Sequence, residues 1–454
     1  SSGTNTSRVY LQANYSIGGT ATTLNLCVGA TSTFAGFYFA GDSAYTTINN
    51  TSAVITIANP DTTNSAAIDQ FQIRSNNPVN ISSSTYTMGN ATPISGGGTM
   101  DFQVYAAPSL ITTLNNDITC TRAYANLTCI VSGSSVTSAA LRTVTLRGNS
   151  PQSSPCLIYL DTPGTTTLTA IDCNVTGRAT AQQTGLPYTI TSLTLTRAVM
   201  VGVVANPYGN VIGTLTFTND ASYGSVLYYS LANLTITTLS CTATAGAPHA
   251  IGTTSDNYAI VSSSSLSLIN ANVYTNFTLS GAANLSISST TSTTYDFWQS
   301  LSSFSPIISM GTGAVTLTNV ATIFNSAVRY SSTASASFTW NNSTLGTTQS
   351  SVSIGAVSPA TAITFSALSL NNLNLTVDAN ITVAAGATLT TFTDTLFKGN
   401  GSYSLSVTGA GGLTSTNTYT KSYGGFDSLN GISVGSGPFT VTNAPSGVIN
   451  TGSL

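Results

Sequence analysis

Apolar and hydroxyl side chains alternate in short stretches along the whole chain. The alternation is clear at residues 54–57 (VITI), 193–196 (LTLT), 215–218 (LTFT) and 234–237 (LTIT). A period of two places apolar side chains on one face of a strand and hydroxyls on the other, which is typical of a half-buried β-strand. Turn-forming sequences separate these stretches, among them 59–61 (NPD), 95–98 (SGGG) and 162–164 (TPG). The pattern predicts an all-β protein.

The spacing of the apolar residues bears on how the strands are arranged. After residue 251, apolar pairs such as Leu266/Leu268 and Phe277/Leu279 recur, often at intervals of about 8 to 12 residues, which suit antiparallel sandwiches and β-solenoid rungs alike. The intervals drift and no turn residue repeats at a fixed period. We therefore expect tandem antiparallel β-sandwich modules, Ig-like or jelly-roll-like, with a β-solenoid in the C-terminal half as the alternative.

Composition along the chain indicates where the modules divide. The last cysteine, Cys241, lies before residue 250, and Ser-rich stretches such as 262–267 (SSSSLS) appear after that point. A second boundary is placed at Pro108 from module length. These changes predict a β-sandwich over 1–108, a disulfide-bearing β-sandwich over 109–250, and a Ser/Thr-rich β region of one or two modules over 251–454.

The chain carries very little charge. Charged residues make up 5% of it, against about 25% in an average soluble domain. All thirteen acidic residues are Asp, and Ser and Thr supply about a third of the chain. Hydroxyls do not titrate as carboxylates do, so we expect stability to stay flat from about pH 2 to 7. A net charge of -3 without a basic cluster argues against nucleic acid as a partner.

The cysteines form an even set of six: Cys27, Cys120, Cys129, Cys156, Cys173 and Cys241. No Cys-x-x-Cys motif accompanies them and the chain has a single histidine, so a zinc site is disfavoured and disulfides are favoured. Proximity in sequence suggests the pairs Cys120–Cys129 and Cys156–Cys173, which leaves Cys27 for Cys241. Buried thiols are the alternative.

Sixteen Asn-x-Ser/Thr sequons predict N-glycosylation of a secreted chain. Their asparagines are Asn5, Asn14, Asn49, Asn50, Asn80, Asn90, Asn126, Asn174, Asn233, Asn276, Asn284, Asn341, Asn342, Asn374, Asn380 and Asn400. A sequon whose asparagine points inward would stay bare. The N-terminal residues lack the features of a signal peptide, so we expect any such peptide to have been removed. No apolar run reaches the roughly 20 residues of a membrane-spanning helix.

Residues for acid–base or nucleophilic catalysis are scarce. The chain has one histidine, His249, no glutamate and two lysines, so we expect no enzymatic activity and no cofactor beyond covalent glycans. A Gly-x-Ser-x-Gly sequence at 431–435 is followed by Gly437-Pro438 rather than a helix, so it does not fit a nucleophile elbow. Glycoside hydrolysis by two aspartates is the remaining enzymatic hypothesis. No Asp-Asp or Asp-x-Asp pair occurs, and isolated residues such as Asp161, Asp172, Asp220 and Asp296 are interpreted as turn or strand-end residues, so no catalytic residue is assigned.

In its low charge, abundant Ser, Thr and Asn, and many sequons, the chain resembles archaeal surface-layer and extracellular filament glycoproteins of acid-loving organisms. That resemblance implies a structural subunit that assembles with copies of itself into a filament, sheath or surface layer. Contacts between strands and between hydroxyl and aromatic side chains would join the copies, with donor-strand exchange at the termini as one route. A carbohydrate-binding adhesin or viral spike is the alternative, and a polysaccharide-cleaving β-helix enzyme is a third hypothesis.

Overall fold

The fold was analysed in a computed structural model of the chain. It describes residues 8–11, 15–18, 23–27, 34–41, 48–51, 54–58, 67–75, 79–88, 98–106, 111–120, 126–132, 141–159, 165–178, 189–201, 210–228, 234–244, 246–252, 259–290, 295–299, 307–323, 328–332, 336–342, 350–356, 363–371, 373–378, 380–383, 390–393, 396–399, 404–407, 413–416, 425–427, 431–434 and 439–442. The described side chains lie mainly between residues 143 and 383.

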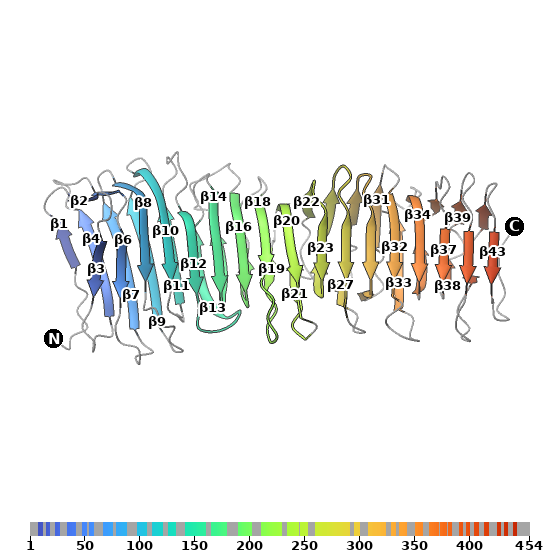
Figure 1. The fold of residues 1–454 in the computed structure, drawn as a ribbon, viewed down its shortest axis with the longest axis horizontal. Helices are drawn as coiled ribbons and strands as arrows, with labels where there is room; N and C mark the ends of the chain where they lie inside the picture. The colour runs from blue at the N-terminus through green and yellow to red at the C-terminus, as the bar shows by residue number, and fades with distance from the viewer. Residues whose placement is uncertain are drawn as a thin grey trace. The chain divides into compact units, whose positions relative to one another are not determined.

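The chain forms two compact units, Ser1–Leu234 (unit 1) and Thr235–Leu454 (unit 2). Within each unit the strands lie side by side and are ordered along the sequence (Figure 1). The pairings between these strands are parallel, as in β12–β14, β16–β18, β26–β29 and β33–β35. Strands on the two sides of residue 108 pair directly, β8 with β10 and β9 with β11.

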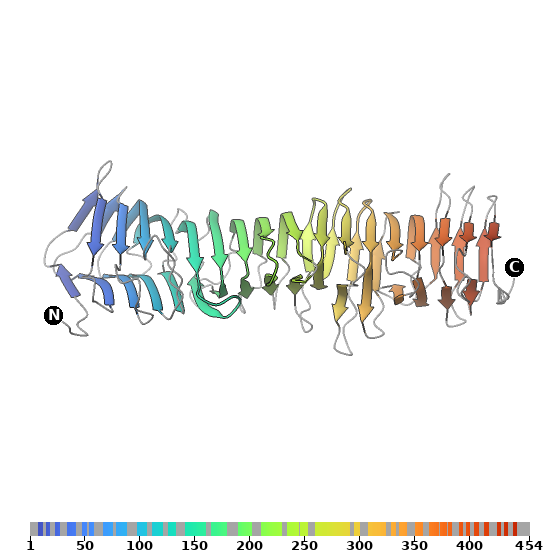
Figure 2. The same cartoon turned by 60° about the horizontal axis from the view of Figure 1, so that its bottom comes forward.

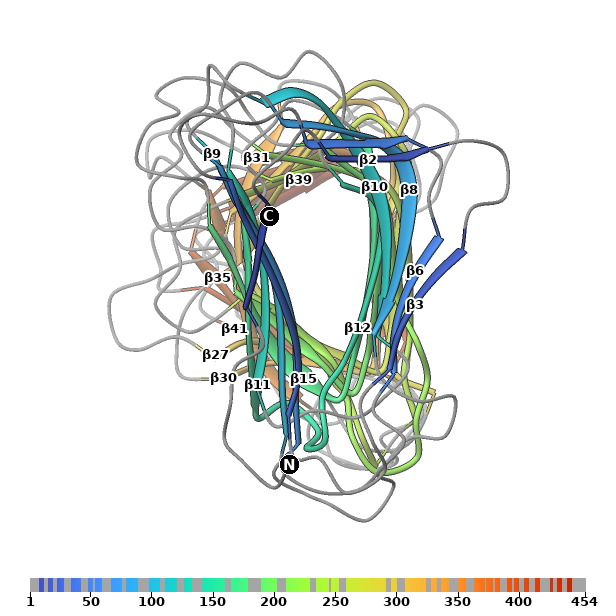
Figure 3. The same ribbon diagram turned by 90° about the vertical axis from the view of Figure 1, so that its left-hand side faces the viewer.

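Unit 1 has two sheets. Sheet 1 contains β1 (Arg8–Leu11), β4 (Phe34–Gly41), β7 (Ala67–Ser75), β9 (Gly98–Ala106), β11 (Asn126–Ser132), β13 (Ser154–Tyr159), β15 (Cys173–Arg178), β17 (Val199–Val201) and β19 (Val226–Tyr228). Sheet 2 contains β2 (Tyr15–Gly18), β3 (Thr23–Cys27), β5 (Ile48–Thr51), β6 (Val54–Ala58), β8 (Val79–Met88), β10 (Ile111–Cys120), β12 (Leu141–Arg147), β14 (Thr165–Ile171), β16 (Thr189–Thr196) and β18 (Asn210–Phe217). Strands of sheets 1 and 2 face each other across the unit (Figures 2 and 3).

The paired strands described in unit 2 can be grouped into three sheets. Sheet 3 contains β21 (His249–Gly252), β24 (Ala271–Tyr274), β27 (Tyr295–Gln299) and β30 (Val320–Ile323). Sheet 4 contains β22 (Ala259–Ser262), β25 (Asn276–Leu279), β28 (Ile307–Met310), β31 (Val328–Ser332), β33 (Ser350–Ala356), β35 (Leu373–Asp378), β38 (Leu396–Gly399) and β41 (Gly425–Asp427). Sheet 5 contains β20 (Leu234–Thr242), β23 (Leu266–Ile269), β26 (Leu285–Ser288), β29 (Val315–Thr318), β32 (Ala336–Asn341), β34 (Ile363–Asn371), β36 (Ile381–Val383), β37 (Thr390–Thr393), β39 (Ser404–Val407), β40 (Leu413–Thr416), β42 (Gly431–Val434) and β43 (Phe439–Thr442).

Each circuit of the chain through the sheets makes one rung, and its apolar residues point inward. Within sheet 2, Leu168, Leu193 and Leu215 stand in one register column, and all three are completely buried. The residues immediately before and after each leucine are hydroxyl-bearing and lie on the outer side. Burying such a leucine stabilises the fold by about 1.5–3 kcal/mol. The alternation seen in the sequence therefore builds a continuous apolar interior along each unit.

One residue in a left-handed conformation turns the chain from one sheet into the next. Asp172 (φ 53°) joins β14 to β15, Asn270 (φ 56°) joins β23 to β24, and Asn319 (φ 54°) joins β29 to β30. Asp and Asn adopt this conformation more readily than other residues with a side chain. At the equivalent corner after β12, a Cβ on Gly148 would collide with the carbonyl oxygen of Asp172, so only glycine fits there.

The prediction of antiparallel β-sandwiches is wrong, because the strands pair in parallel in both units. The alternative, a β-solenoid, was expected only for the C-terminal half, and it describes the sheets of unit 1 as well. Rungs of unequal length hid it in the sequence. In sheet 4, Ile260 pairs with Phe277, 17 residues on, and Phe277 pairs with Ile308, 31 residues on. Loops of different length absorb the difference between rungs.

Candidate functional site

Two columns of hydroxyl side chains run along the outer side of sheet 2, on β12, β14, β16 and β18. We call these eight residues the hydroxyl face: Thr143, Thr167, Ser192 and Thr214 in one column, and Thr145, Thr169, Thr194 and Thr216 in the other. Thr143 is exposed and the other seven are half-buried. The four strands lie next to one another in Figure 1. Neither column contains a charged residue on these four strands, and backbone pairing places Asp117 of β10 next to Thr143.

The eight residues of the hydroxyl face are in continuous register from Thr143/Thr145 to Thr214/Thr216. A register shift between Thr166 and Thr167 lies directly at the edge of the face. Backbone pairing continues the second column to Thr119, Thr87 and Thr56. In sheet 5 the columns on β23, β29 and β34 include Ile269 and Asn371 beside Ser and Thr, whereas Thr391/Thr393, Thr414/Thr416 and Thr440/Thr442 on β37, β40 and β43 again align in two threonine columns. The hydroxyl face is the array of this kind whose side chains are described on every strand.

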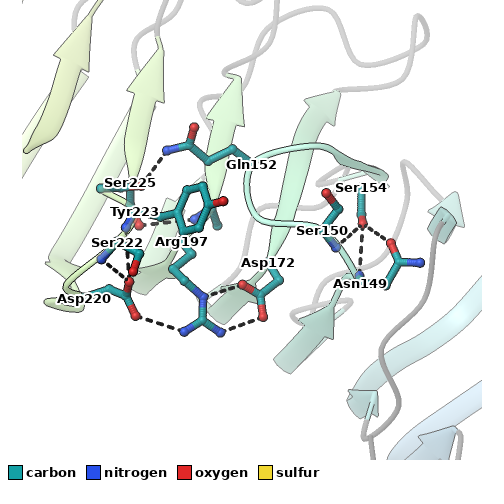
Figure 4. A network of polar contacts seen from close by, with 12 residues as sticks. Asn149, Ser150, Gln152, Ser154, Asp172, Arg197, Asp220, Ser222, Tyr223 and Ser225 are labelled. Carbon is teal, nitrogen blue, oxygen red and sulfur yellow. Dashed lines mark hydrogen bonds and ion pairs between the residues drawn. The ribbon is translucent and has the colours of Figure 1, made fainter. Parts of the chain in front are cut away.

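An ion-pair network lies at the corner beside this face (Figure 4). Arg197 follows β16 and also has a left-handed backbone (φ 47°). Its Nε and Nη2 donate to the two carboxylate oxygens of Asp172, at 2.5 and 2.7 Å, and its Nη1 donates to Oδ2 of Asp220 at 3.0 Å. One guanidinium thus binds the carboxylates of the preceding and the following corner and joins three rungs.

The same network fixes the turn that follows β18. Asp220 Oδ1 accepts hydrogen bonds from the backbone N–H groups of Ser222 (2.9 Å) and Tyr223 (3.1 Å). These two bonds, chiefly that from Ser222, and the Arg197 guanidinium lower the pKa of the Asp220 carboxyl. Hydrogen bonding, mainly to Asp172, raises the pKa of Arg197. Arg197 and Asp220 therefore both stay charged at neutral pH.

Replacing Arg197 by methionine should lower the free energy of unfolding by about 1–2 kcal/mol, because Asp172 loses both hydrogen bonds from the guanidinium. Asp220 keeps its two backbone donors. Arg197→Lys keeps the charge but cannot bind Asp172 through two nitrogens, so it should recover only part of the loss. Urea denaturation at low and at high salt measures both variants. Equal stability of Arg197→Met and wild type at low salt would contradict the prediction.

Buried asparagines have the equivalent role in unit 2. Asn270 Nδ2 donates to the carbonyl of Ala243 (2.7 Å), and its Oδ1 accepts from the N–H of Thr290 (2.9 Å). Asn342 is completely buried. Its amide accepts from Val320 N and donates to Val320 O, both at 3.0 Å. These contacts satisfy backbone groups at the corners between one rung and the next.

The sequon asparagines occupy very different environments. Asn284 and Asn380 are exposed, Asn174, Asn276 and Asn341 are half-buried, and Asn342 is buried. For Asn49, Asn50, Asn80, Asn126 and Asn374 only the strand backbone is described, and Asn5, Asn14, Asn90, Asn233 and Asn400 lie outside the described residues. The burial of these asparagines therefore divides the predicted glycosylation sites into accessible and inaccessible ones.

We expect glycans at Asn284 and Asn380 and none at Asn342 in folded protein from a glycosylating host. A glycan on Nδ2 of Asn284 leaves Oδ1 to accept the Ala314 N–H (2.7 Å). A glycan on Asn342 would have to be attached to the Nδ2 that donates to Val320 O, at a completely buried position without room for a sugar. Glycopeptide mass spectrometry of the folded fraction measures occupancy. Substantial occupancy of Asn342 there would contradict the described corner.

The disulfide prediction is wrong for the cysteines whose side chains are described. Cys120, Cys129, Cys156, Cys173 and Cys241 are buried and not joined by disulfides. The strand register explains why: Cys156 lies opposite Leu127 and Val175, whereas Cys129 lies opposite Ile158 and Cys173 opposite Ser154. The cysteines fill inward positions as small apolar side chains. The side chain of Cys27, and with it the predicted pair with Cys241, lies outside the described part.

Burial also makes these thiols unreactive. It raises the pKa of Cys173 to about 12 and that of Cys241 well above its usual value. Burial also raises the pKa of Cys156, and the neighbouring thiols of Cys173, Cys129 and Cys120 raise it further. Thiolate is the form that reacts and binds metal, so these residues are poor nucleophiles. Among the described residues no group of three His, Cys, Asp or Glu could hold a metal ion.

The remaining residues considered for catalysis do not form a catalytic arrangement in the described part of the chain. His249 is buried in β21. Asp172 and Asp220 share Arg197. Asp161 and the side chain of Asp296 lie outside the described part, and Gly431–Val434 is strand β42 rather than a strand-to-helix elbow. Sequence reasoning missed the hydroxyl face, whose signal is Thr/Ser-x-Thr at 143, 167, 192 and 214, on four successive strands of sheet 2.

Comparison with protein-family models, curated proteins and solved structures finds no match for this chain. In the described ranges no helix is long and apolar enough to cross a membrane. Function must therefore be argued from the geometry of the solenoid units.

Proposed function

We propose that the chain is a structural subunit of an extracellular filament, sheath or surface layer, and not an enzyme. The observation that carries the proposal is how the polar corner groups are used. Arg197 and Asp172 bind each other, and Asn342 binds Val320, each across neighbouring rungs. Groups that an enzyme would direct toward a substrate are here bonded within the scaffold.

The strand arrangement supports self-assembly. A parallel solenoid leaves the outer strand of each terminal rung with backbone N–H and C=O groups directed along the stacking axis. Among the described strands of sheet 1 the outermost is β1, which pairs with β4. A strand from another copy can continue the sheet by the same parallel pairing. End-to-end addition of copies would then extend the existing hydrogen-bond pattern.

Electron microscopy of the native protein tests the proposal, and filaments or sheets are the expected result. Deleting residues 1–12 removes β1 and should block polymerisation through this edge. A shortened chain that still polymerises would overturn the donor-strand route, and a wild type that stays monomeric would overturn the structural role. Circular dichroism of the shortened chain checks that the remaining strands are folded.

Tyr223 favours glycan binding as a second candidate function. The residue is 47% exposed, a large value for an aromatic residue, and the Asp220 turn holds its backbone in place. Tyrosine rings stack on sugars and add one polar tip. Binding of wild type to a glycan array, lost in Tyr223→Ala, would support this function. An array that wild type does not bind would remove it.

A further inference from the structure

We infer that the hydroxyl face binds ice, that is, water held in a crystal lattice. The inference is independent of whether the protein assembles with copies of itself. It starts from the spacing of the eight side chains. Strands of one sheet lie about 4.8 Å apart, and residues two positions apart on a strand are about 6.6 Å apart. The oxygen lattice on the prism faces of hexagonal ice repeats in two perpendicular directions at distances close to these.

The side chains of the hydroxyl face are held in fixed positions. Seven of the eight are threonine, whose branched Cβ restricts χ1 strongly. Directly behind them lie Val144, Leu168, Leu193 and Leu215, which are completely buried and anchor the strands. Hydroxyl and methyl groups therefore repeat together from rung to rung. A repeating array can order a layer of water before ice is met, which lowers the entropic cost of binding.

The chemistry of the face selects water over a protein partner. Protein interfaces draw their affinity from Trp, Tyr and Arg anchors and are depleted in Ser. The hydroxyl face offers neither aromatic nor charged anchors, and a dry partner would desolvate eight hydroxyls at a cost. Against ice the hydroxyls keep their hydrogen bonds to water, and the methyl groups fill the spaces between them.

The regular pattern also has a defined limit. The next outward column of sheet 2 contains Arg147, Ile171 and Thr196. Arg147 and the bulky Ile171 break the repeat beside the Asp172–Arg197 corner. Two hydroxyl columns of four rungs are thus the surface available to ice in the part of sheet 2 with described side chains.

The test measures whether the full chain adsorbs to ice. We expect wild type to separate the freezing point from the melting point and to enter a growing ice ball. The double variant Thr169→Lys/Thr194→Lys places two charges in the centre of the face and should lose both effects. Ser153→Lys is the matched control: it adds a lysine at an exposed turn away from the face and should behave as wild type.

A second variant covers the case in which lysines disturb sheet 2. Thr194→Ser keeps the hydroxyl and removes one methyl group, so it should fold normally and show reduced freezing-point separation. Far-UV circular dichroism and urea midpoints confirm folding. The inference is overturned if wild type does not affect ice growth, if both face variants retain full activity, or if Ser153→Lys loses it. Binding to crystalline cellulose or chitin without any effect on ice would also overturn it.

Discussion

Replacing Trp340 by alanine should lower the free energy of unfolding of unit 2 by about 3–5 kcal/mol, the range measured when large aromatic side chains are removed from protein cores. Trp340 is completely buried in β32 and lies in register between Leu317 and Leu370. Its Nε1 donates a hydrogen bond to the carbonyl of Val320 at 3.3 Å. The variant loses the packing and leaves that carbonyl with one partner fewer.

The surrounding aromatic residues cannot fill the space that Trp340 leaves. Phe338 meets Trp340 edge to face, with ring centroids 6.2 Å apart, and packs on Phe365 at 5.1 Å. Rungs above and below hold these rings in place, so a cavity should remain. Urea denaturation followed by circular dichroism gives the loss. Thr339→Ala, on the outer side of the same strand, should change stability by less than about 0.5 kcal/mol.

A loss for Trp340→Ala no larger than that for Thr339→Ala would contradict the packed interior of unit 2. The effect is also expected to stay local, because the rungs of a solenoid contact chiefly their neighbours. A hydrogen-exchange measurement should accordingly show faster exchange around β29 and β34 than at more distant rungs of unit 2. Uniform acceleration across unit 2 would mean that the unit unfolds as one cooperative block.

The strands could be predicted from the sequence, but their arrangement could not. Alternation at 193–196 and 215–218 places Leu and Phe inside and Thr outside, as β16 and β18 have them. Parallel and antiparallel sheets produce the same period of two, so this pattern cannot distinguish them. The deciding signal is the one-residue corner. The corner is occupied by an Asp (Asp172), an Arg (Arg197) or an Asn (Asn270), all with the same left-handed backbone. Because no single residue type marks every corner, the sequence does not reveal it.

The functional residues were hidden for a related reason. Thr169 and Thr194 are unremarkable in a chain with so much Thr, and they acquire meaning only when the register places them in one column. The cysteines show the opposite error. Cys156 and Cys173 are close in sequence and were expected to bond, but the register places them two residues out of step. In both cases the information lies in pairing between rungs, which sequence distance does not report.

Stability should fall by about 3 kcal/mol as the pH decreases from 6.5 to 4 because of His249, contrary to the flat profile expected from composition. Burial in β21 lowers the pKa of His249 to about 4, against a weaker opposing hydrogen bond to the Thr242 backbone. In the unfolded chain its pKa is about 6.5. Between these values the unfolded state binds the extra proton, so stability is complete above pH 6.5 and is lost as the pH falls toward 4.

The difference between wild type and His249→Gln isolates this contribution. Glutamine does not titrate in this range, so the variant should be less stable at neutral pH yet nearly independent of pH from about 6.5 to 4. Free energies of unfolding across that range should therefore converge as the solution is acidified. Parallel curves would show that His249 is not the titrating group. The pKa of Asp220 is lowered, so any loss of stability from its protonation occurs in more acidic solution. Between pH 6.5 and 4, His249 is therefore the group that we expect to limit the acid tolerance of this hydroxyl-covered protein.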